Sequence, residues 1–348
     1  MSTLPRVAIV LVNWNGWRHC VECLDSLLAQ SYPNYHVFVV DNDSQDESVP
    51  RMVEWCAAPR AEPDWCSHAD VKRVTGAGTA GAIACRLIDR PDQALPPAPP
   101  GTQLTLIRSG GNRGFAGGCN VGIRAAGLEA FELFWLLNTD TVVHHDALAA
   151  LVSRVSADET IGMVGSTIRY YDSPEKVQCL GGARLDMATM TSLLIGEGSS
   201  IQAVPVDGKS VETQMTYVMG ASMLVSRKFV KDVGLLQEDY FLYYEEIDWA
   251  VRGRSRFKLG YAPASHVLHR SGATSSQVMP AFTSNLYYRN RLRFVSRFFP
   301  ERLAAAKRGL AIDLMRHTLK GRWTHARIVA AALWDAPKLA VQAHIGGA

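Results

Sequence analysis

The chain has 348 residues and a formal net charge of +3, and 47% of its residues are hydrophobic. This length allows one large α/β domain with an appendage or two domains, and the apolar fraction is sufficient for a sizeable core. The charge is too small to indicate a nucleic-acid partner, and no apolar run approaches the roughly 20 residues of a membrane-spanning helix. Seven scattered cysteines, with no leader pattern before the first apolar run, are typical of a reduced cytoplasmic protein.

Continuous β-branched runs alternate with helical patterns in the N-terminal half. Val7 to Val12 is followed by the turn NWNG, and Tyr35 to Val40 is followed by DNDS. This alternation predicts an α/β fold with a mostly parallel central sheet and helices on both faces, so the polar loops after the strands should gather along one edge. Further strands are expected at 104–107, 162–169 and 215–225, and a helix from about Cys119.

Cys20 and Cys23 form a C-x-x-C motif inside a helical pattern of apolar residues. No second pair of ligands follows nearby, so the motif does not predict a zinc site. We expect both side chains to pack in the core, as unpaired cysteines usually do.

Residues 56–103 are interpreted as an insertion, because Cys, Pro, Ala and Gly dominate them. The stretch RPDQALPPAPPG suits neither a helix nor a central strand. Gly76, Gly78 and Gly81 have the G-x-G-x-x-G spacing of dinucleotide-binding loops, but the preceding HADVKRV is short and charged, and Asp89 comes too early for the acidic partner. A dinucleotide cofactor is therefore not expected.

A buried strand expected at Phe134 to Leu137 ends at Asn138-Thr139-Asp140. One interpretation is that Asp140 or Thr141 caps the helix that begins near His145, because both residues accept hydrogen bonds from free amides. The other is a metal or substrate site, because ligands of open α/β sheets bind beyond the carboxyl ends of the strands. The local sequence leaves both interpretations open.

Acidic and aromatic residues are interleaved in EDYFLYYEEIDWAVR, residues 238–252. An acidic helix start is favourable with the helix dipole, but six acids between Asp232 and Asp248 exceed what capping requires.

From Phe282 onward, arginines and lysines are interleaved with Tyr, Phe and Leu. That pattern predicts amphipathic helices. They either lie on an anionic membrane surface, which we favour, or pack on the preceding domain with a solvated basic face.

Four stretches, in this order, resemble a family 2 glycosyltransferase of the GT-A fold, closest to its rhamnosyltransferase-like branch: VAIVLVNWNG, VVDNDSQDES, GNRGFAGGCNVGI with LLNTDT, and GLLQEDYFLYYEEIDWAVR with HRSGAT. The resemblance covers about residues 5–275 and, weakly, the Arg-Asn of YYRNR. It implies a Rossmann-like GT-A domain at 1–275, with the insertion at about 56–103, and a C-terminal amphipathic helical region at 276–348.

The resemblance implies a divalent cation, Mg²⁺ or Mn²⁺, at Asp140. The family closes a strand with D-x-D, which here reads Asn138-Thr139-Asp140, so only the second carboxylate remains. His269 matches the late metal-binding histidine of the family, whereas His266 does not match and is interpreted as structural. A single carboxylate needs another protein ligand and the donor diphosphate to complete the coordination shell.

Nucleotide contacts are also implied by the resemblance. Asp41 would accept the N3–H of uracil or thymine, although an Asx turn is the alternative use of this residue. Asn13 and Trp14 would touch the base or ribose. In the glycine-rich stretch, where glycines would let the backbone approach the nucleotide, Asn112 and Arg113 would be the polar contacts.

The catalytic base of the family lies in a Glu-Asp-x-Asp motif, which here reads Glu245-Glu246-Ile247-Asp248. The resemblance implies that Glu246 is the base, with a side chain one methylene longer than the usual Asp. Glu245 and Asp248, three residues apart, share one helical face and would orient the site or hold acceptor hydroxyls.

We therefore predict a cytoplasmic, metal-dependent, inverting glycosyltransferase whose donor is a nucleoside diphosphate sugar, by resemblance dTDP-rhamnose. The acceptor would be a growing, lipid-linked cell-surface glycan, with the protein peripheral at the inner face of the plasma membrane if the basic region binds lipid. One rival is a nucleotidyltransferase, which would need a lysine-bearing glycine-rich loop where this chain has Asn13-Trp14-Asn15. The other is a catalytically inactive sugar-nucleotide-binding scaffold, which Asn138 and Glu246 leave open.

Overall fold

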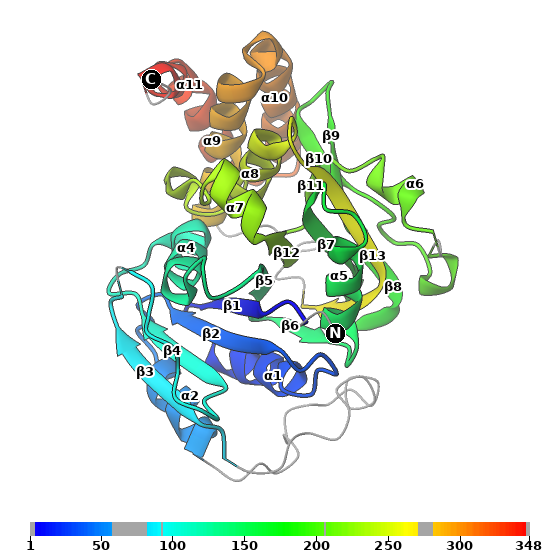
Figure 1. The fold of residues 1–348 in the computed structure, drawn as a ribbon. Coiled ribbons are helices and arrows are strands. Elements are labelled where there is room, and N and C mark those ends of the chain that lie inside the picture. Colours follow the sequence, from blue (N-terminus) through cyan, green and yellow to red (C-terminus); the bar gives the residue numbers. More distant parts are fainter. Residues whose placement is uncertain (1–3, 58–81, 92, 205–206, 271–280, 346–348) are drawn as a thin grey trace.

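The computed structural model describes residues 4–57, 82–91, 93–204, 207–270 and 281–345. Within these ranges the main sheet has ten strands in the order β3-β4-β2-β1-β5-β12-β7-β13-β6, with β8 paired to β7 (Figure 1). Its strands are β1 (Val7–Asn13), β2 (Tyr35–Asp41), β3 (Cys85–Asp89), β4 (Leu104–Arg108), β5 (Leu133–Asn138), β6 (Thr141–Val143), β7 (Ile161–Tyr170), β8 (Ser173–Leu180), β12 (Ser222–Ser226) and β13 (Lys258–His269). A small antiparallel sheet contains β9 (Gly182–Asp186), β10 (Thr191–Leu194) and β11 (Tyr217–Val218).

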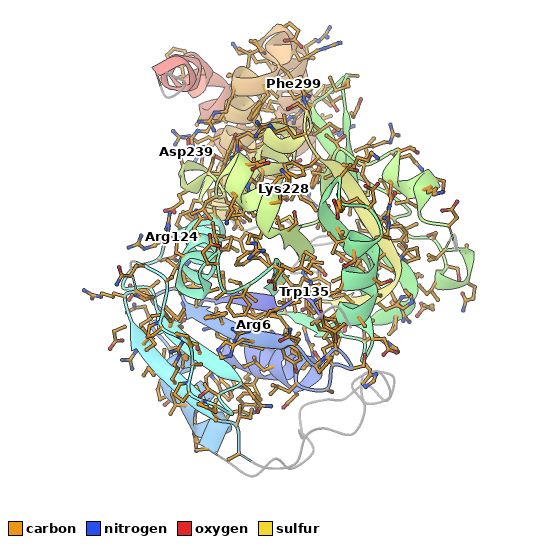
Figure 2. The ribbon with its side chains drawn as sticks, in the orientation of Figure 1. Arg6, Arg124, Trp135, Lys228, Asp239 and Phe299 are labelled. Atoms are coloured by element: carbon orange, nitrogen blue, oxygen red, sulfur yellow. The ribbon has the colours of Figure 1, made fainter. Side chains whose placement is uncertain are left out.

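Helices cover both faces of the main sheet (Figure 1). The described helices are α1 (Trp17–Leu27), α2 (Ser48–Ala57), α4 (Gly114–Ala126), α5 (Ala147–Ser156), α6 (Lys209–Glu212), α7 (Arg227–Val233), α8 (Glu245–Gly253), α9 (Ala281–Phe298), α10 (Leu303–Leu319) and α11 (Trp323–Ile345). Helices α10 and α11 pack on α9 and on each other, away from the sheet. Because strand side chains alternate, Ile9 and Leu11 pack in one core with α1, α2 and α5, while Ala8 and Val10 pack in the other with α4 and α8. Trp135 on β5 is fully buried near the middle of the molecule (Figure 2), where its Nε1 donates to Ser222 Oγ at 3.0 Å.

Strands β3, β4, β2, β1 and β5 are parallel neighbours, and β12 is antiparallel to both β5 and β7. The predicted α/β architecture is therefore confirmed. Cys20 and Cys23 are both buried in α1, as expected of core residues.

Several predicted boundaries were wrong. The region interpreted as an insertion contributes β3, which extends the sheet beyond β4, because its Cys85–Asp89 backbone pairs with β4 despite the prolines that follow. The strand expected at 215–225 is divided between β11 and β12, which belong to different sheets. Gly76, Gly78 and Gly81 lie outside the described residues.

The glycine-rich stretch starts α4 earlier than expected, at Gly114, and its glycines have a packing role. A Cβ on Gly118 or Gly122 would lie 2.6 Å and 2.3 Å from the side chains of Val12 and Val10, so these positions let α4 lie directly against β1. In the described structure, these two glycines face the sheet, and the expectation that they admit a nucleotide is not met at them.

Helix α9 packs into the core of the α/β domain, so the predicted boundary at 275/276 does not separate two cores. Its Leu292 and Phe294 are fully buried in the same cluster as Val10. Arg291 is also fully buried, with Nη1 3.3 Å from Asp313 Oδ2, and Arg297 is paired with an acid of α8. The lipid-facing role predicted for this stretch is thus replaced by packing. Of the helices described, none is long and apolar enough to cross a membrane.

Candidate active site

The carboxyl ends of four strands bring polar residues to one edge of the sheet. Asn13 ends β1, Asp41 ends β2, Asn138 ends β5 and His269 ends β13. Val12 of β1 is paired with Asn138 of β5, so Asn13 and Asn138 lie at the ends of adjacent strands. The predicted gathering of polar loops at one edge is observed, and a ligand at this edge would meet all four strand ends.

Asp140 faces His269 at this edge. Asp140 Oδ1 lies 3.3 Å from His269 Nε2, and the Asp140 carbonyl accepts a hydrogen bond from the amide of Arg270 at 2.9 Å. Burial raises the pKa of Asp140, but the charge and hydrogen bond of His269 outweigh it and hold the pKa below its ordinary value. The capping interpretation was wrong, because strand β6 follows directly and α5 begins at Ala147, with Asp146 as its N-cap.

Gln178 orients the imidazole of His269. His269 Nδ1 lies 2.9 Å from Gln178 Oε1, and both side chains are buried. An amide oxygen only accepts hydrogen bonds, so Nδ1 carries a proton. When the ring is neutral, Nε2 presents its lone pair toward Asp140 and Asn138, and when the ring is protonated, Nε2 donates to Asp140. This is the arrangement of a metal-binding histidine held by an outer partner. Sequence analysis missed Gln178, which is 91 positions from His269 and has no local signal.

Asn13, Asp41 and Ser44 form a buried hydrogen-bonded group beside the metal-binding candidates. Asn13 Nδ2 donates to Asp41 Oδ1 at 3.1 Å and to Ser44 Oγ at 3.2 Å, and the Ser44 amide donates to Asp41 Oδ2 at 3.1 Å. Asp41 thus holds its own loop, through the amide three residues on and not the one two residues on that defines an Asx turn. Asn13 Oδ1, in contrast, is a buried acceptor with no partner among the described residues. Trp14 is 56% exposed at the same edge.

Asn42, another residue that sequence analysis missed, shapes the loop of Asn112 and Arg113. Its Nδ2 donates to Asn112 Oδ1 and to the Gly114 carbonyl, and its Oδ1 accepts from the Arg113 amide at 3.1 Å. Asn42 is buried, while the side chains it positions are exposed. The only signal was its place directly after Asp41 in a polar run.

Glu245 and Glu246 begin α8 as a pair of poorly solvated carboxyl groups. Burial raises the pKa of Glu246 from 4.5 to about 7, and burial followed by the charge of Glu246 raises that of Glu245 further. One carboxyl oxygen of each residue is buried without a hydrogen-bond partner in the described structure. Burial thus disfavours the charged form of both carboxyls, and Glu246 titrates near pH 7, where it can accept a proton.

A strained turn positions this pair. Phe241, Tyr243 and Tyr244 have φ of 64°, 68° and 76°, which is unfavourable for aromatic residues. Asn290 of α9 is buried and donates from Nδ2 to the carbonyls of Tyr240 and Leu242 at 2.7 and 2.9 Å, and to that of Tyr243. Backbone strain of this kind persists where surrounding contacts over-determine it, and it is typical of functional sites.

Asp248 faces away from the open edge and is fully buried. Its Oδ1 lies 2.6 Å from Arg252 Nε, and its Oδ2 lies 3.1 Å from Arg297 Nη1 and accepts from Tyr240 Oη at 3.1 Å. These contacts join α8 to α9. Asp248 therefore fixes α8, the helix that carries Glu246, against α9.

The metal-binding candidates and Glu246 lie near the same backbone segment. The Asn138 amide donates to the Ala221 carbonyl at 3.1 Å. A Cβ built on the adjacent Gly220 would lie 3.9 Å from the Glu246 carboxyl carbon and 3.8 Å from Phe115. The segment before β12 therefore joins the end of β5, two residues before Asp140, to the start of α8, which carries Glu246.

The mostly parallel sheet with helices on both faces is of the GT-A type, with a carboxylate and a histidine at its carboxyl edge. The model of "Glycosyltransferase like family 2" matches residues 93–308, and that of "Glycosyl transferase family 2" matches residues 8–83. The chain belongs to glycosyltransferase family 2, which confirms the resemblance seen in its motifs.

Two known proteins illustrate the relationship. The low-salt glycan biosynthesis hexosyltransferase Agl10 of Haloferax volcanii is 23% identical over 299 residues, covering 83% of this chain and 75% of the relative. The mannosyltransferase of Pyrobaculum calidifontis, solved in complex with GDP-Man and Mn²⁺, superposes with a TM-score of 0.52 at 15% identity, covering 98% of this chain and 88% of that one. The second likeness confirms the fold.

Proposed function

We propose that this protein is a metal-dependent, inverting glycosyltransferase that moves a sugar from a nucleoside diphosphate to a hydroxyl of a growing glycan. The observation that supports the proposal is the Asp140–His269 pair at the carboxyl edge of the sheet, together with the unpaired carboxyl oxygen of Glu246 beside the segment that joins β5 to β12. Rhamnose from dTDP-rhamnose is the proposed donor and rests on the motif resemblance. Agl10, a relative named for glycan biosynthesis, supports the class of acceptor.

The residues present fit a divalent cation. Asp140 supplies a carboxylate oxygen and His269 an imidazole lone pair, while the described residues contain no group of three His, Cys, Asp or Glu side chains that could hold a metal by themselves. Mg²⁺ and Mn²⁺ are commonly held by one or two protein ligands together with substrate phosphates and water. When bound, the cation would stabilise the negative charge that develops on the leaving diphosphate.

The protein side chains account for the remaining steps. Asp41 would accept an N–H of the nucleotide base, and Asn13 and Trp14 would contact the base or ribose. The unpaired Oδ1 of Asn13 and the exposed ring of Trp14 support these contacts. Glu246 removes the proton of the acceptor hydroxyl, because its pKa of about 7 makes it a base at neutral pH. Attack from the side opposite the diphosphate inverts the anomeric centre.

A screen of nucleotide sugars tests this proposal. Unfolding temperature is measured with dTDP-rhamnose, UDP-GlcNAc and GDP-Man, each with Mn²⁺ or with EDTA, because ligands stabilise the state that binds them. We expect one donor to raise it only with metal, and Asp140→Ala to abolish the increase without unfolding the protein. Equal binding in EDTA contradicts the metal assignment. Binding without transfer or donor hydrolysis would instead identify the inactive scaffold.

The turn between α10 and α11 is the proposed contact with an anionic membrane that bears the acceptor. Met315, Leu319 and Trp323 are 56%, 80% and 62% exposed there. Lys320 and Arg322 lie between them and have no ion pair among the described residues. Apolar side chains surrounded by cations are typical of surfaces that insert into anionic lipid. This surface lies at the C-terminal end of the basic stretch, residues 282–323, for which the sequence pattern predicted a membrane contact.

Sedimentation with vesicles of anionic and zwitterionic lipid tests the membrane contact. We expect binding to anionic vesicles that weakens with salt and is lost in the double variant Leu319→Glu/Trp323→Glu. Leu193→Glu, on β10 and also partly exposed, is the matched control and should bind normally. Failure of the full-length protein to sediment at low salt removes this part of the proposal and leaves the enzymatic part standing.

A further inference from the structure

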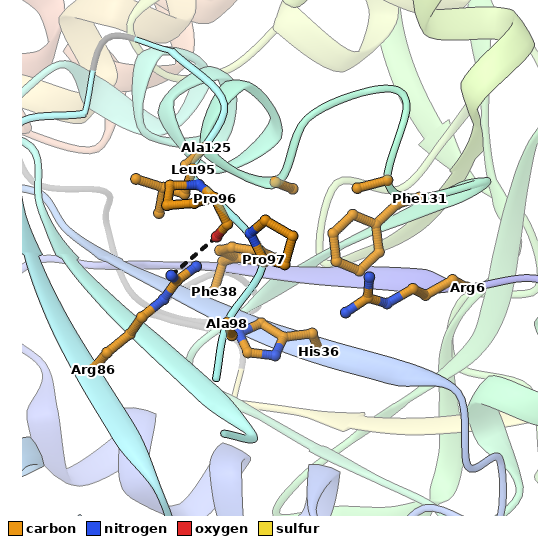
Figure 3. Close-up of a pocket in the computed structure, with 12 residues that line it drawn as sticks. Arg6, His36, Phe38, Arg86, Leu95, Pro96, Pro97, Ala98, Ala125 and Phe131 are labelled. Atoms are coloured by element: carbon orange, nitrogen blue, oxygen red, sulfur yellow. Dashed lines mark hydrogen bonds between the residues drawn. The ribbon is translucent and has the colours of Figure 1, made fainter. Parts of the chain in front are cut away.

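A small pocket lies at the edge of the sheet opposite the candidate active site. It is formed where the parallel strands begin: Arg6 precedes β1, His36 is near the start of β2, Arg86 is near the start of β3 and Phe131 precedes β5. The prolines that lead from β3 to β4 close one side (Figure 3). Its volume is about 60 Å³, several times the roughly 10–15 Å³ that one water requires on this measure.

Two guanidinium groups face this pocket without a counter-ion. Among its lining residues there is no Asp or Glu, and in the part of the chain that the structure describes neither Arg6 nor Arg86 has an ion pair. The Arg6 guanidinium lies 4.5 Å from the centre of the Phe131 ring. The nearby Glu132 accepts a hydrogen bond from the Arg6 backbone amide, at 2.7 Å. Two unpaired cations in one partly buried space repel each other, which favours an anion between them.

A hydrogen-bonded relay holds Arg86 and His36. Arg86 Nε donates to Thr105 Oγ1 at 2.9 Å, and that hydroxyl lies 2.8 Å from His36 Nε2, while Arg86 Nη1 donates to the Pro96 carbonyl at 3.1 Å (Figure 3). Burial and then the charges of Arg86 and Arg6 lower the pKa of His36 to about 4. Burial also lowers the pKa of Arg86. The imidazole is thus neutral, and both cations act on it without a neutralising carboxylate.

We propose that this pocket is a binding site for a phosphate-type oxyanion, held between the guanidiniums of Arg6 and Arg86. Guanidinium groups match the geometry and charge of phosphate oxygens. The volume suits one such group, and the Phe, Pro and Ala lining offers little to a larger polar ligand. Because the site is at the amino ends of the strands, it is separate from the donor diphosphate site and does not depend on the proposed reaction.

Titration calorimetry of the full-length protein with inorganic phosphate tests the proposal. EDTA is present, so that metal-dependent binding at the other edge is suppressed, and ionic strength is held with chloride. We expect saturable binding of one phosphate, weakened at least about tenfold in Arg6→Gln and in Arg86→Gln. Arg6 has no side-chain hydrogen bond among the described residues, so its variant should fold even if that of Arg86 does not.

Two controls make the outcome specific. Arg108→Gln removes an exposed arginine paired with Asp89 at the opposite end of β4 and should leave phosphate binding unchanged, as should Asp140→Ala. The ring signals of His36, followed by NMR, should shift with phosphate in the wild type and not in Arg6→Gln. Methyl phosphate that binds at least as well would show that the ligand is the phosphate end of a larger molecule. Equal binding by Arg6→Gln, or displacement by chloride at equal ionic strength, overturns the proposal.

Discussion

Replacement of Glu246 by Gln should separate activity from stability, because the raised pKa of this carboxyl has a cost in the folded state. A pKa raised from 4.5 to about 7 corresponds to a loss of about 3 kcal/mol in the free energy of unfolding when the carboxyl is ionised, at 1.36 kcal/mol per pKa unit. Because the side chain is only half-buried, solvent screening reduces this loss to about 1–3 kcal/mol. The folded protein binds the proton more tightly than the unfolded chain does, so the neutral acid is tolerated below pH 4.5 and stability is lost as the pH rises toward 7. Glu246→Gln removes that loss.

Transfer rates and urea unfolding, both measured from pH 5 to pH 8.5, test this reasoning. Wild-type kcat/KM should fall about tenfold per pH unit below pH 7, because the protonated form cannot act as a base. Glu246→Gln should reduce transfer by about 100-fold or more while donor binding persists, and its gain in stability over the wild type should grow from pH 5 to pH 8.

Glu245→Gln is the matched control, because it removes the neighbouring buried carboxyl from the same helix start and leaves Glu246 in place. It should retain most of the transfer activity. The assignment of the base is refuted if Glu246→Gln keeps near-normal turnover while Glu245→Gln or Asp248→Asn is inactive. If all three variants remain active, this acidic segment does not supply the base.

Two further predictions follow from the hydrogen bonds around the site. Asp248→Asn leaves Arg252 and Arg297 without their buried partner and should lower the free energy of unfolding by about 3 kcal/mol in urea titrations; a loss below about 0.5 kcal/mol would show that the α8–α9 junction does not depend on this pair. Gln178→Leu removes the acceptor that orients His269 and should weaken Mn²⁺ affinity, measured calorimetrically with nucleoside diphosphate, by about 10- to 100-fold, whereas Gln178→Glu should restore it. Unchanged affinity in Gln178→Leu would contradict the orienting role.

Local pattern was sufficient for the elements and for the edge where the candidate site lies. Apolar runs that stop at Asn13, Asp41 and Asn138 determine both a strand and its end, and parallel strands necessarily bring such ends together. The positions of Asp140 and His269 followed from the same logic once their motifs were matched. Strand β3 was not predicted, because its short sequence is stabilised by pairing with β4 rather than by its own pattern.

Only the tertiary structure decided the uses of the charged and polar side chains. The spacing of arginines along α9 would be the same whether they faced lipid or an acid of α8. In the folded protein, Arg297 pairs with Asp248. Gln178 and Asn290 received their roles from contacts across 91 and about 50 residues of sequence. Periodicity reports which face of an element is apolar, whereas the partner of a buried polar group depends on which elements meet, and that is settled by the packing of the whole chain.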